Sequence, residues 1–263
     1  MGRDVRVASI GVIGINGEIA RNMDTESTAI RAVIFDMDGV LIDSFGPHFE
    51  SWREMFAEYG QQITLADFAN TFGKTSRETI PIIRPELDPI RDEPKILEMD
   101  RRKEFLYREI VNRKYPVMPG IPELLERLRS AGILIGIGSS APQENVAQGL
   151  PHLDPNGTFF DAVANGSEVE HGKPSPEVFL LALKKLRAIS PTLRAEHCVV
   201  VEDSPLGIRA AHAAGMTAIG FCSAGHSHEE YIDADRKIDH PDEITIAMVR
   251  ELTAGNGEIS DVS

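Results

Sequence analysis

The hydrophobic positions form short continuous runs in some segments and recur at helical spacing in others. Val33, Ile34 and Phe35 are a continuous apolar run, which is typical of a strand covered on both faces. Similar runs predict further strands at residues 132–138, 160–164, 198–201 and 217–221. Amphipathic segments between them predict helices at residues 121–130, 143–149, 175–187 and 205–214. This alternation predicts an α/β fold, a Rossmann-like doubly wound parallel sheet with helices on both faces.

Residues 45–115 have a different pattern, with no segment that favours a strand. Phe49, Trp52 and Phe56 recur at helical spacing and predict a helix ending near residues 59–60. Further helical segments are expected at residues 65–72, 76–83 and 95–111, interrupted by Pro81, Pro85, Pro89 and Pro94. We therefore expect residues 45–115 to be a helical cap inserted into a core of residues 30–44 and 116–252.

The two ends of the chain carry weaker patterns. Residues 1–29 are interpreted as an N-terminal extension, either a flexible arm or the product of an upstream start codon with Met23 as the natural start. The glycines of residues 11–17 match neither the dinucleotide-binding fingerprint nor the Walker loop. Residues 253–263 are polar and are expected to form a frayed C-terminal tail.

Composition narrows the functional classes. The chain has 263 residues, of which 42% are hydrophobic and 26% charged, as in ordinary globular proteins. No apolar run could span a bilayer, and two cysteines favour a reducing, cytoplasmic setting over a disulfide framework. A net charge of -14 argues against nucleic acid as a partner. The sequence leaves open whether the chain is a monomer or a small homo-oligomer.

Polar side chains follow the ends of the predicted strands, and these ends meet at one edge of a parallel sheet. The candidates are Asp36 and Asp38, Ser139 and Ser140, Lys173, and Glu202 and Asp203. Carboxylates converging there would repel one another without a cation, and ligation by oxygen alone suits Mg²⁺. No spacing of histidines and cysteines in the sequence indicates a zinc site.

Four motifs in this order give the chain a family resemblance. They are Asp36-Met37-Asp38-Gly39-Val40, Ser139 after an apolar strand, Gly172-Lys173-Pro174-Ser175-Pro176, and Glu202-Asp203-Ser204. Residues 30–245 thereby resemble the haloacid dehalogenase superfamily of phosphotransferases. The insertion after the first motif resembles the α-helical cap of its β-phosphoglucomutase-like branch.

The resemblance implies a role for each matching residue. Asp36 would be the nucleophile that becomes an aspartyl phosphate, and Asp38 the general acid and base. Mg²⁺ would be held by Asp36, the backbone carbonyl of Asp38 and Asp203, with Glu202 nearby or bound through water. The transferring phosphoryl group would be bound by Ser139, Ser140 and Lys173. To act as an acid near neutral pH, Asp38 would need its pKa raised from ~3.9 to about 7.

Three cap residues are further candidates by the same resemblance. His48 would assist proton transfer, Arg77 would hold the non-reacting phosphate of a bisphosphorylated sugar, and Lys103 would face the active site. The alternative interpretation is that all three are ordinary helix-surface residues.

The sequence therefore predicts a Mg²⁺-dependent phosphatase acting on a small phosphorylated metabolite, with a sugar phosphate favoured. The alternative is a β-phosphoglucomutase-like isomerase, in which a sugar hydroxyl replaces water as the acceptor. A regulatory binding module with a silent site is a third hypothesis, which the complete set of four motifs disfavours.

Overall fold

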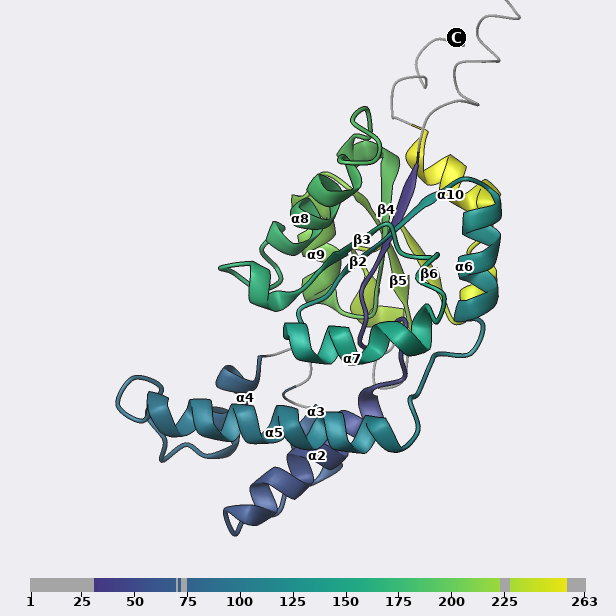
Figure 1. Ribbon diagram of the computed structural model, residues 1–263. Helices are drawn as coiled ribbons and strands as arrows, with labels where there is room; N and C mark the ends of the chain where they lie inside the picture. Colours follow the sequence, from purple (N-terminus) through teal and green to yellow (C-terminus); the bar gives the residue numbers. More distant parts are fainter. Residues whose placement is uncertain (1–30, 70, 72–74, 223–227, 255–263) are drawn as a thin grey trace, which may run out of the picture.

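The computed structural model describes residues 31–69, 71, 75–222 and 228–254. In this part of the chain, a parallel sheet has the strand order β3-β2-β1-β4-β5-β6 (Figure 1). The strands are β1 (Ala32–Phe35), β2 (Leu134–Gly138), β3 (Ala162–Ala164), β4 (Cys198–Glu202), β5 (Thr217–Phe221) and β6 (Arg236–Ile238). The order reverses direction at β1, so the carboxyl end of β1 lies at the topological switch point of the sheet.

Strand β1 is buried on both faces, which explains its continuous apolar run. Val33 is in register with Ile135 of β2 and Val199 of β4. Its side chain joins the hydrophobic cluster under α6 (Ile121–Ser130), α7 (Gln143–Leu153) and α10 (Ile246–Thr253). Ile34 joins the opposite cluster, under α8 (Glu177–Leu186) and α9 (Pro205–Ala213). Helices on both faces of a parallel sheet confirm the predicted fold class.

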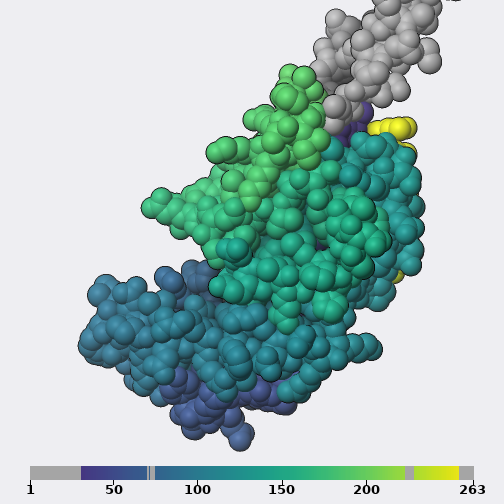
Figure 2. Space-filling model, in the orientation of Figure 1, coloured from purple at the N-terminus to yellow at the C-terminus, as the bar shows by residue number. Residues whose placement is uncertain are grey.

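The insertion after β1 folds as helices with a hydrophobic cluster of their own. They are α2 (Phe45–Glu58), α3 (Leu65–Ala69), α4 (Ser76–Ile83) and α5 (Glu93–Arg113). Their shared cluster includes Trp52, Met55, Phe56, Ile80 and Met99. Figures 1 and 2 show this helical layer below the carboxyl edge of the sheet, and the space-filling view of Figure 2 shows a notch between the two parts. No strand occurs among the described residues of this insertion.

Short 3₁₀ helices occupy several loops of the core. They are η1 (Gly166–Glu168), η2 (Ala195–His197), η3 (His228–Tyr231) and η4 (Pro241–Glu243). Helix η3 lies between β5 and β6 in the chain, and its Tyr231 contacts the backbone of Asp203 just after the end of β4.

The boundaries differ from the sequence-based expectation in several places. Strand β6 and helix α10 are additional elements, and α7 continues four residues beyond the expected end at Gly149, to Leu153. Helix α4 has the expected bounds, Ser76–Ile83, and is not interrupted at Pro81. A proline in the second half of a short helix removes one hydrogen bond but leaves the capped first turn intact: Thr75 forms a capping box with Glu78.

The predicted tail from residue 253 begins one residue too early. Thr253 is 2% exposed at the end of α10, and its hydroxyl accepts a hydrogen bond from Arg31 Nε at 2.8 Å. The predicted extension (1–29) and the rest of the predicted tail (255–263, after Ala254) lie outside the described residues. Among the helices that the structure describes, none is long and apolar enough to cross a membrane.

Candidate active site

Three buried carboxylates meet where β1 and β4 end. Asp36 follows β1 and its backbone N–H donates to Val201 of β4 at 2.9 Å, so the sheet itself fixes the distance between the two strand ends. Glu202 ends β4 and Asp203 follows it. Carboxylate oxygens of Asp36, Glu202 and Asp203 lie within 4.8 Å of one another, and all three residues are buried. The structure thus brings together three of the four predicted acidic residues.

Lys173 places its ammonium group between two of these carboxylates. Its Nζ donates to Asp36 Oδ1 at 2.7 Å and to Glu202 Oε1, and it lies 4.9 Å from the centre of the Phe179 ring. Burial alone would lower the pKa of Lys173, but Asp36 and Glu202 raise it above its ordinary value. Lys173 is therefore a fixed positive charge beside the Asp36 carboxylate.

Two glycines make room for the acidic side chains. Gly39 has a φ of 75°, and a Cβ there would lie 1.7 Å from Asp203 Oδ2. A Cβ on Gly207 would lie 1.9 Å from the Glu202 carboxylate. Glu202 is further oriented by Ser204, whose backbone N–H and hydroxyl both donate to Oε2 at 2.9 Å. Both glycines are required because the carboxylates approach the backbone closely.

The charges at this edge do not balance among the described residues. Burial, with a contribution from Glu202, raises the pKa of Asp36 to about 7 despite the opposing effect of Lys173. Burial and the neighbouring Glu202 and Asp36 raise the pKa of Asp203 well above its ordinary value. One ammonium group faces three carboxylates, so a divalent cation fits the excess charge. Oxygen-only donors at this spacing fit Mg²⁺.

Asp38 is held by residues of the cap. His48 Nε2 lies 3.2 Å from Asp38 Oδ1, and the Tyr107 hydroxyl donates to the same oxygen at 3.1 Å. Burial alone would raise the pKa of Asp38, but hydrogen bonds from His48 and Ser44 and the charge of Lys103 lower the pKa to about 2. The expectation that the pKa of Asp38 is raised is therefore wrong for this arrangement. The family resemblance did not predict how strongly the hydrogen bond from His48 would favour the ionised carboxylate.

His48 and Lys103 belong to one contact network above Asp38. His48 Nδ1 lies 3.0 Å from Lys103 Nζ, and the His48 ring stacks on Tyr107 with 4.1 Å between ring centres. The Lys103 ammonium lies 5.3 Å from the centre of the Trp52 ring, and Lys103 is only 3% exposed. Tyr107 was not among the predicted site residues, although its spacing of four from Lys103 places both on one helix face.

The same network continues from the cap helix α5 to the core helix α7. Lys103 Nζ donates to Glu104 Oε1 at 2.8 Å, and Glu104 Oε2 accepts from Asn145 Nδ2 at 2.6 Å. Asn145 Oδ1 in turn accepts from Arg108 at 2.9 Å. Burial alone would raise the pKa of Glu104, but Lys103 and His48 lower it below its ordinary value. Glu104 therefore stays ionised and ties the cap to the core in the arrangement described.

The remaining predicted residues, Ser139, Ser140 and Arg77, lie outside the cluster of buried carboxylates. Ser139 is buried directly after β2, and its Oγ accepts from the Ala141 N–H at 3.0 Å, whereas Ser140 is exposed. Arg77 is exposed in the first turn of α4 and lies near Asp100. Within the described part of the chain, it makes no ion pair with the acidic residues of the site. On the core side, the Tyr231 hydroxyl of η3 donates to the backbone carbonyl of Asp203 at 2.6 Å.

Comparison with known proteins agrees with this geometry. Residues 30–215 match the family model of the haloacid dehalogenase-like hydrolases. The chain belongs to that family, which confirms the predicted resemblance and the prediction that it is an enzyme.

Individual relatives within this family include phosphatases of phosphorylated sugars and a β-phosphoglucomutase. A phosphorylated carbohydrates phosphatase of Thermotoga maritima is 34% identical over 192 residues, covering 72% of this chain and 84% of the relative. A fructose-1-phosphate phosphatase of Escherichia coli is 31% identical over 194 residues, covering 71% and 94%. The solved structure of β-phosphoglucomutase from Clostridium difficile superposes with a TM-score of 0.72 at 26% identity, covering 86% of this chain and 97% of that one.

The close approach at Gly39 yields a first prediction. Gly39→Ala should destabilise the fold more than Gly60→Ala, because both glycines have positive φ but a Cβ at Gly60 meets nothing within 4 Å. The control should cost about 1–2 kcal/mol from its backbone conformation alone. Urea unfolding of the two variants measures the difference, and equal losses would show that Asp203 is not held against the Gly39 loop.

The raised pKa of Asp36 yields a second prediction. In metal-free protein, native Asp36 keeps a proton up to about pH 7 that the unfolded chain releases near pH 3.8. The free energy of unfolding should therefore fall as pH rises through this range, with a slope of at most about 1.4 kcal/mol per pH unit from this group.

Added Mg²⁺ should stabilise the protein more at about pH 8 than at about pH 5, because the ion binds the ionised carboxylates. Urea unfolding with and without Mg²⁺ at both pH values tests this, and Asp36→Asn should reduce the metal-free slope while the contribution of Asp203 remains. A Mg²⁺ effect that is the same at both pH values would contradict the proposed ligands.

Proposed function

We propose that this enzyme is a Mg²⁺-dependent phosphatase of small phosphorylated metabolites, with sugar phosphates as its substrate class. The observation that carries the proposal is the buried Asp36 carboxylate, paired with Lys173 at 2.7 Å and surrounded by Glu202 and Asp203. The relatives from Thermotoga maritima and Escherichia coli, which are named as phosphatases of phosphorylated carbohydrates and of fructose 1-phosphate, support the substrate class.

In the proposed reaction, an Asp36 oxygen attacks the phosphorus atom and the bond to the leaving oxygen breaks. Lys173 and Ser139 bind the non-bridging oxygens of the transferring group. Asp36, Asp203 and the backbone carbonyl of Asp38 would hold Mg²⁺, with Glu202 oriented by Lys173 and Ser204 beside them. When bound, the ion offsets the negative charge shared by the carboxylates and the phosphoryl group.

Proton transfer falls to Asp38 together with His48. His48 and Asp38 share a proton, because Asp38 Oδ1 lies 3.2 Å from His48 Nε2. Asp38 passes this proton to the leaving oxygen in the first step. In the second step, Asp38 accepts a proton from the water that attacks the aspartyl phosphate, which releases inorganic phosphate and restores Asp36. The ionised Asp38 of this arrangement is suited to that second step.

A β-phosphoglucomutase-like isomerase is the second candidate. It is favoured by the position of His48 and Lys103 over Asp38 and by the superposition on β-phosphoglucomutase. A mutase must also grip the second phosphate of its bisphosphorylated intermediate, and the candidate for that grip, Arg77, is exposed near Asp100 in the arrangement described. We therefore favour water as the acceptor.

Both cysteines are free thiols, which supports the proposed reducing, cytoplasmic setting.

Loss of the nucleophile should abolish turnover. Asp36→Asn is expected to lower the rate of phosphate release by at least about 10⁴-fold, because the amide cannot form the aspartyl phosphate. Asp43→Asn, an exposed carboxylate in the same loop, serves as the matched control and should keep the rate. The rates are measured on a panel of sugar phosphates with Mg²⁺. A folded Asp36→Asn protein with a near-normal rate would exclude the covalent mechanism.

The choice between water and sugar hydroxyl can be measured directly. With β-glucose 1-phosphate and a bisphosphate primer, the unmodified protein should release inorganic phosphate without forming glucose 6-phosphate. Arg77→Ala should change that rate by less than about threefold, as should Arg101→Ala, an exposed arginine of α5 chosen as control. Efficient glucose 6-phosphate formation that is lost in Arg77→Ala alone would identify the enzyme as a mutase.

A further inference from the structure

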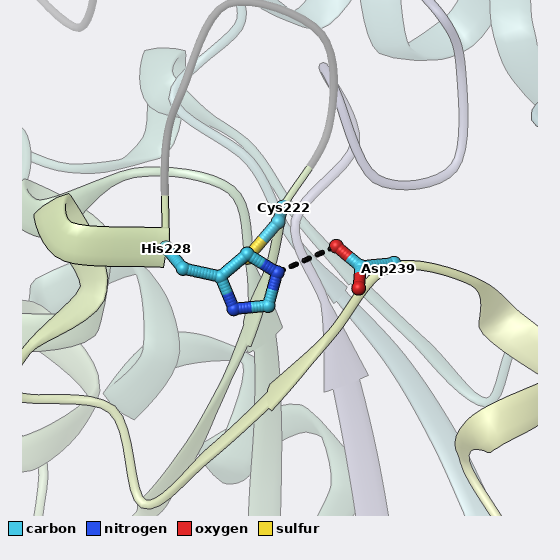
Figure 3. Close-up of side chains that lie close together, drawn as sticks. All are labelled: Cys222, His228 and Asp239. Atoms are coloured by element: carbon cyan, nitrogen blue, oxygen red, sulfur yellow. Dashed lines mark hydrogen bonds and ion pairs between the residues drawn. The ribbon is translucent and has the colours of Figure 1, made fainter.

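A second group of ligand-type side chains lies beyond the ends of β5 and β6. Figure 3 shows Cys222, His228 and Asp239 pointing toward one another from three different segments. A thiol sulfur, an imidazole nitrogen and a carboxylate oxygen of these residues lie within 4.8 Å of one another. His228 Nε2 lies 2.6 Å from Asp239 Oδ1. None of these residues belongs to the proposed phosphatase chemistry.

The backbone holds each member of this group in place. Cys222 directly follows β5, and its N–H donates to Ile238 O of β6 at 2.8 Å, which sets it beside Asp239. His228 opens η3, and its carbonyl accepts a hydrogen bond from Lys237 Nζ at 2.9 Å. The strand pairing and the Lys237 contact thus bring the three residues together, so no large rearrangement is needed for their side chains to share one ligand.

The donor set determines which ligand fits. Thiolate and imidazole are ligands for zinc and related transition metals, whereas Mg²⁺ prefers oxygen atoms alone. We propose that Cys222, His228 and Asp239 form a binding site for a divalent transition-metal ion of the zinc class, separate from the acidic site at Asp36. Three protein ligands leave a fourth tetrahedral position for water or another ligand.

Charge and access are consistent with an ion at this position. Binding of the ion would release the Cys222 thiol proton to solvent, and the resulting thiolate and the Asp239 carboxylate would together carry the two negative charges that balance a divalent cation. The side chains of His228 and Asp239 are 53% and 69% exposed, and Cys222 is half-buried, so an ion could reach the donor atoms from solvent.

A similar pair elsewhere provides a comparison. His212 Nε2 lies 2.8 Å from Asp235 Oδ2, also at the surface, but these two residues have no third ligand-type side chain grouped with them in the described part of the chain. A histidine–aspartate contact alone is an ordinary surface ion pair. The Cys222 sulfur is what distinguishes the proposed site from such a pair.

Zinc binding by the full-length chain tests the proposal. The purified protein is stripped with a chelator, incubated with Zn²⁺ in excess Mg²⁺, passed through gel filtration and analysed for metal content. Excess Mg²⁺ competes with zinc at the oxygen-only site, and the variants below decide at which site the retained zinc is held. We expect about one zinc ion per chain in the unmodified protein.

Variants assign that zinc ion to its ligands. Cys222→Ala and His228→Ala should each weaken zinc binding by more than about 100-fold. Loss of a residue that only hydrogen-bonds to a metal ligand already weakens metal binding by about 10–100-fold. His212→Ala is the matched control and should retain the ion. Circular dichroism confirms that each variant is folded. Retention by Cys222→Ala equal to that of the unmodified protein would overturn the proposal.

A second measurement needs no variant. Cys198 is fully buried, so iodoacetamide reacts with the native protein at Cys222 among the two cysteines of the chain. Zn²⁺ in excess Mg²⁺ should slow this reaction by about tenfold or more, because a metal-bound thiolate is a poor nucleophile. An unchanged alkylation rate at a zinc concentration that gives stoichiometric retention would place the ion elsewhere and refute the proposed site.

Discussion

The repulsion among the buried carboxylates at the carboxyl edge of the sheet is the constraint on which the rest of the site depends. Asp36, Glu202 and Asp203 are brought within 4.8 Å because β1 and β4 are neighbours and end at the same level. Lys173 offsets part of this charge. The absence of a Cβ at Gly39 and Gly207 allows the carboxylates to lie against the backbone. A divalent cation completes the balance of charge in the proposed function.

The cap is coupled to this constraint through Asp38. A partly buried, ionised carboxylate such as Asp38 needs hydrogen-bond donors, and His48 and Tyr107 supply them from two different helices of the insertion. Glu104 and Asn145 add a second connection, from α5 to the core helix α7. Opening the cap would expose or unpair these groups together, so the cap position and the protonation of the acid–base pair are linked in one network.

The sequence predicted the sheet core and the positions of the acidic residues because both follow from local patterns. A continuous apolar run that ends in Asp36 identifies a buried strand and its chemistry at once. Strand β6 was missed because two of its three residues, Arg236 and Lys237, are charged and exposed. The lowered pKa of Asp38 and the meeting of Cys222 with His228 and Asp239 depend on contacts between distant segments, which residue spacing does not encode.

The position of Trp52 has a consequence for how this enzyme can be observed. It is the one tryptophan of the sequence, it is buried in the hydrophobic cluster of the cap, and the Lys103 ammonium lies 5.3 Å from its ring centre. Lys103 in turn contacts His48, and His48 contacts the Asp38 carboxylate. The indole therefore lies three contacts away from Asp38, and a charge beside an indole alters its fluorescence. Excitation of this single fluorophore would report cap movement during turnover without any added label.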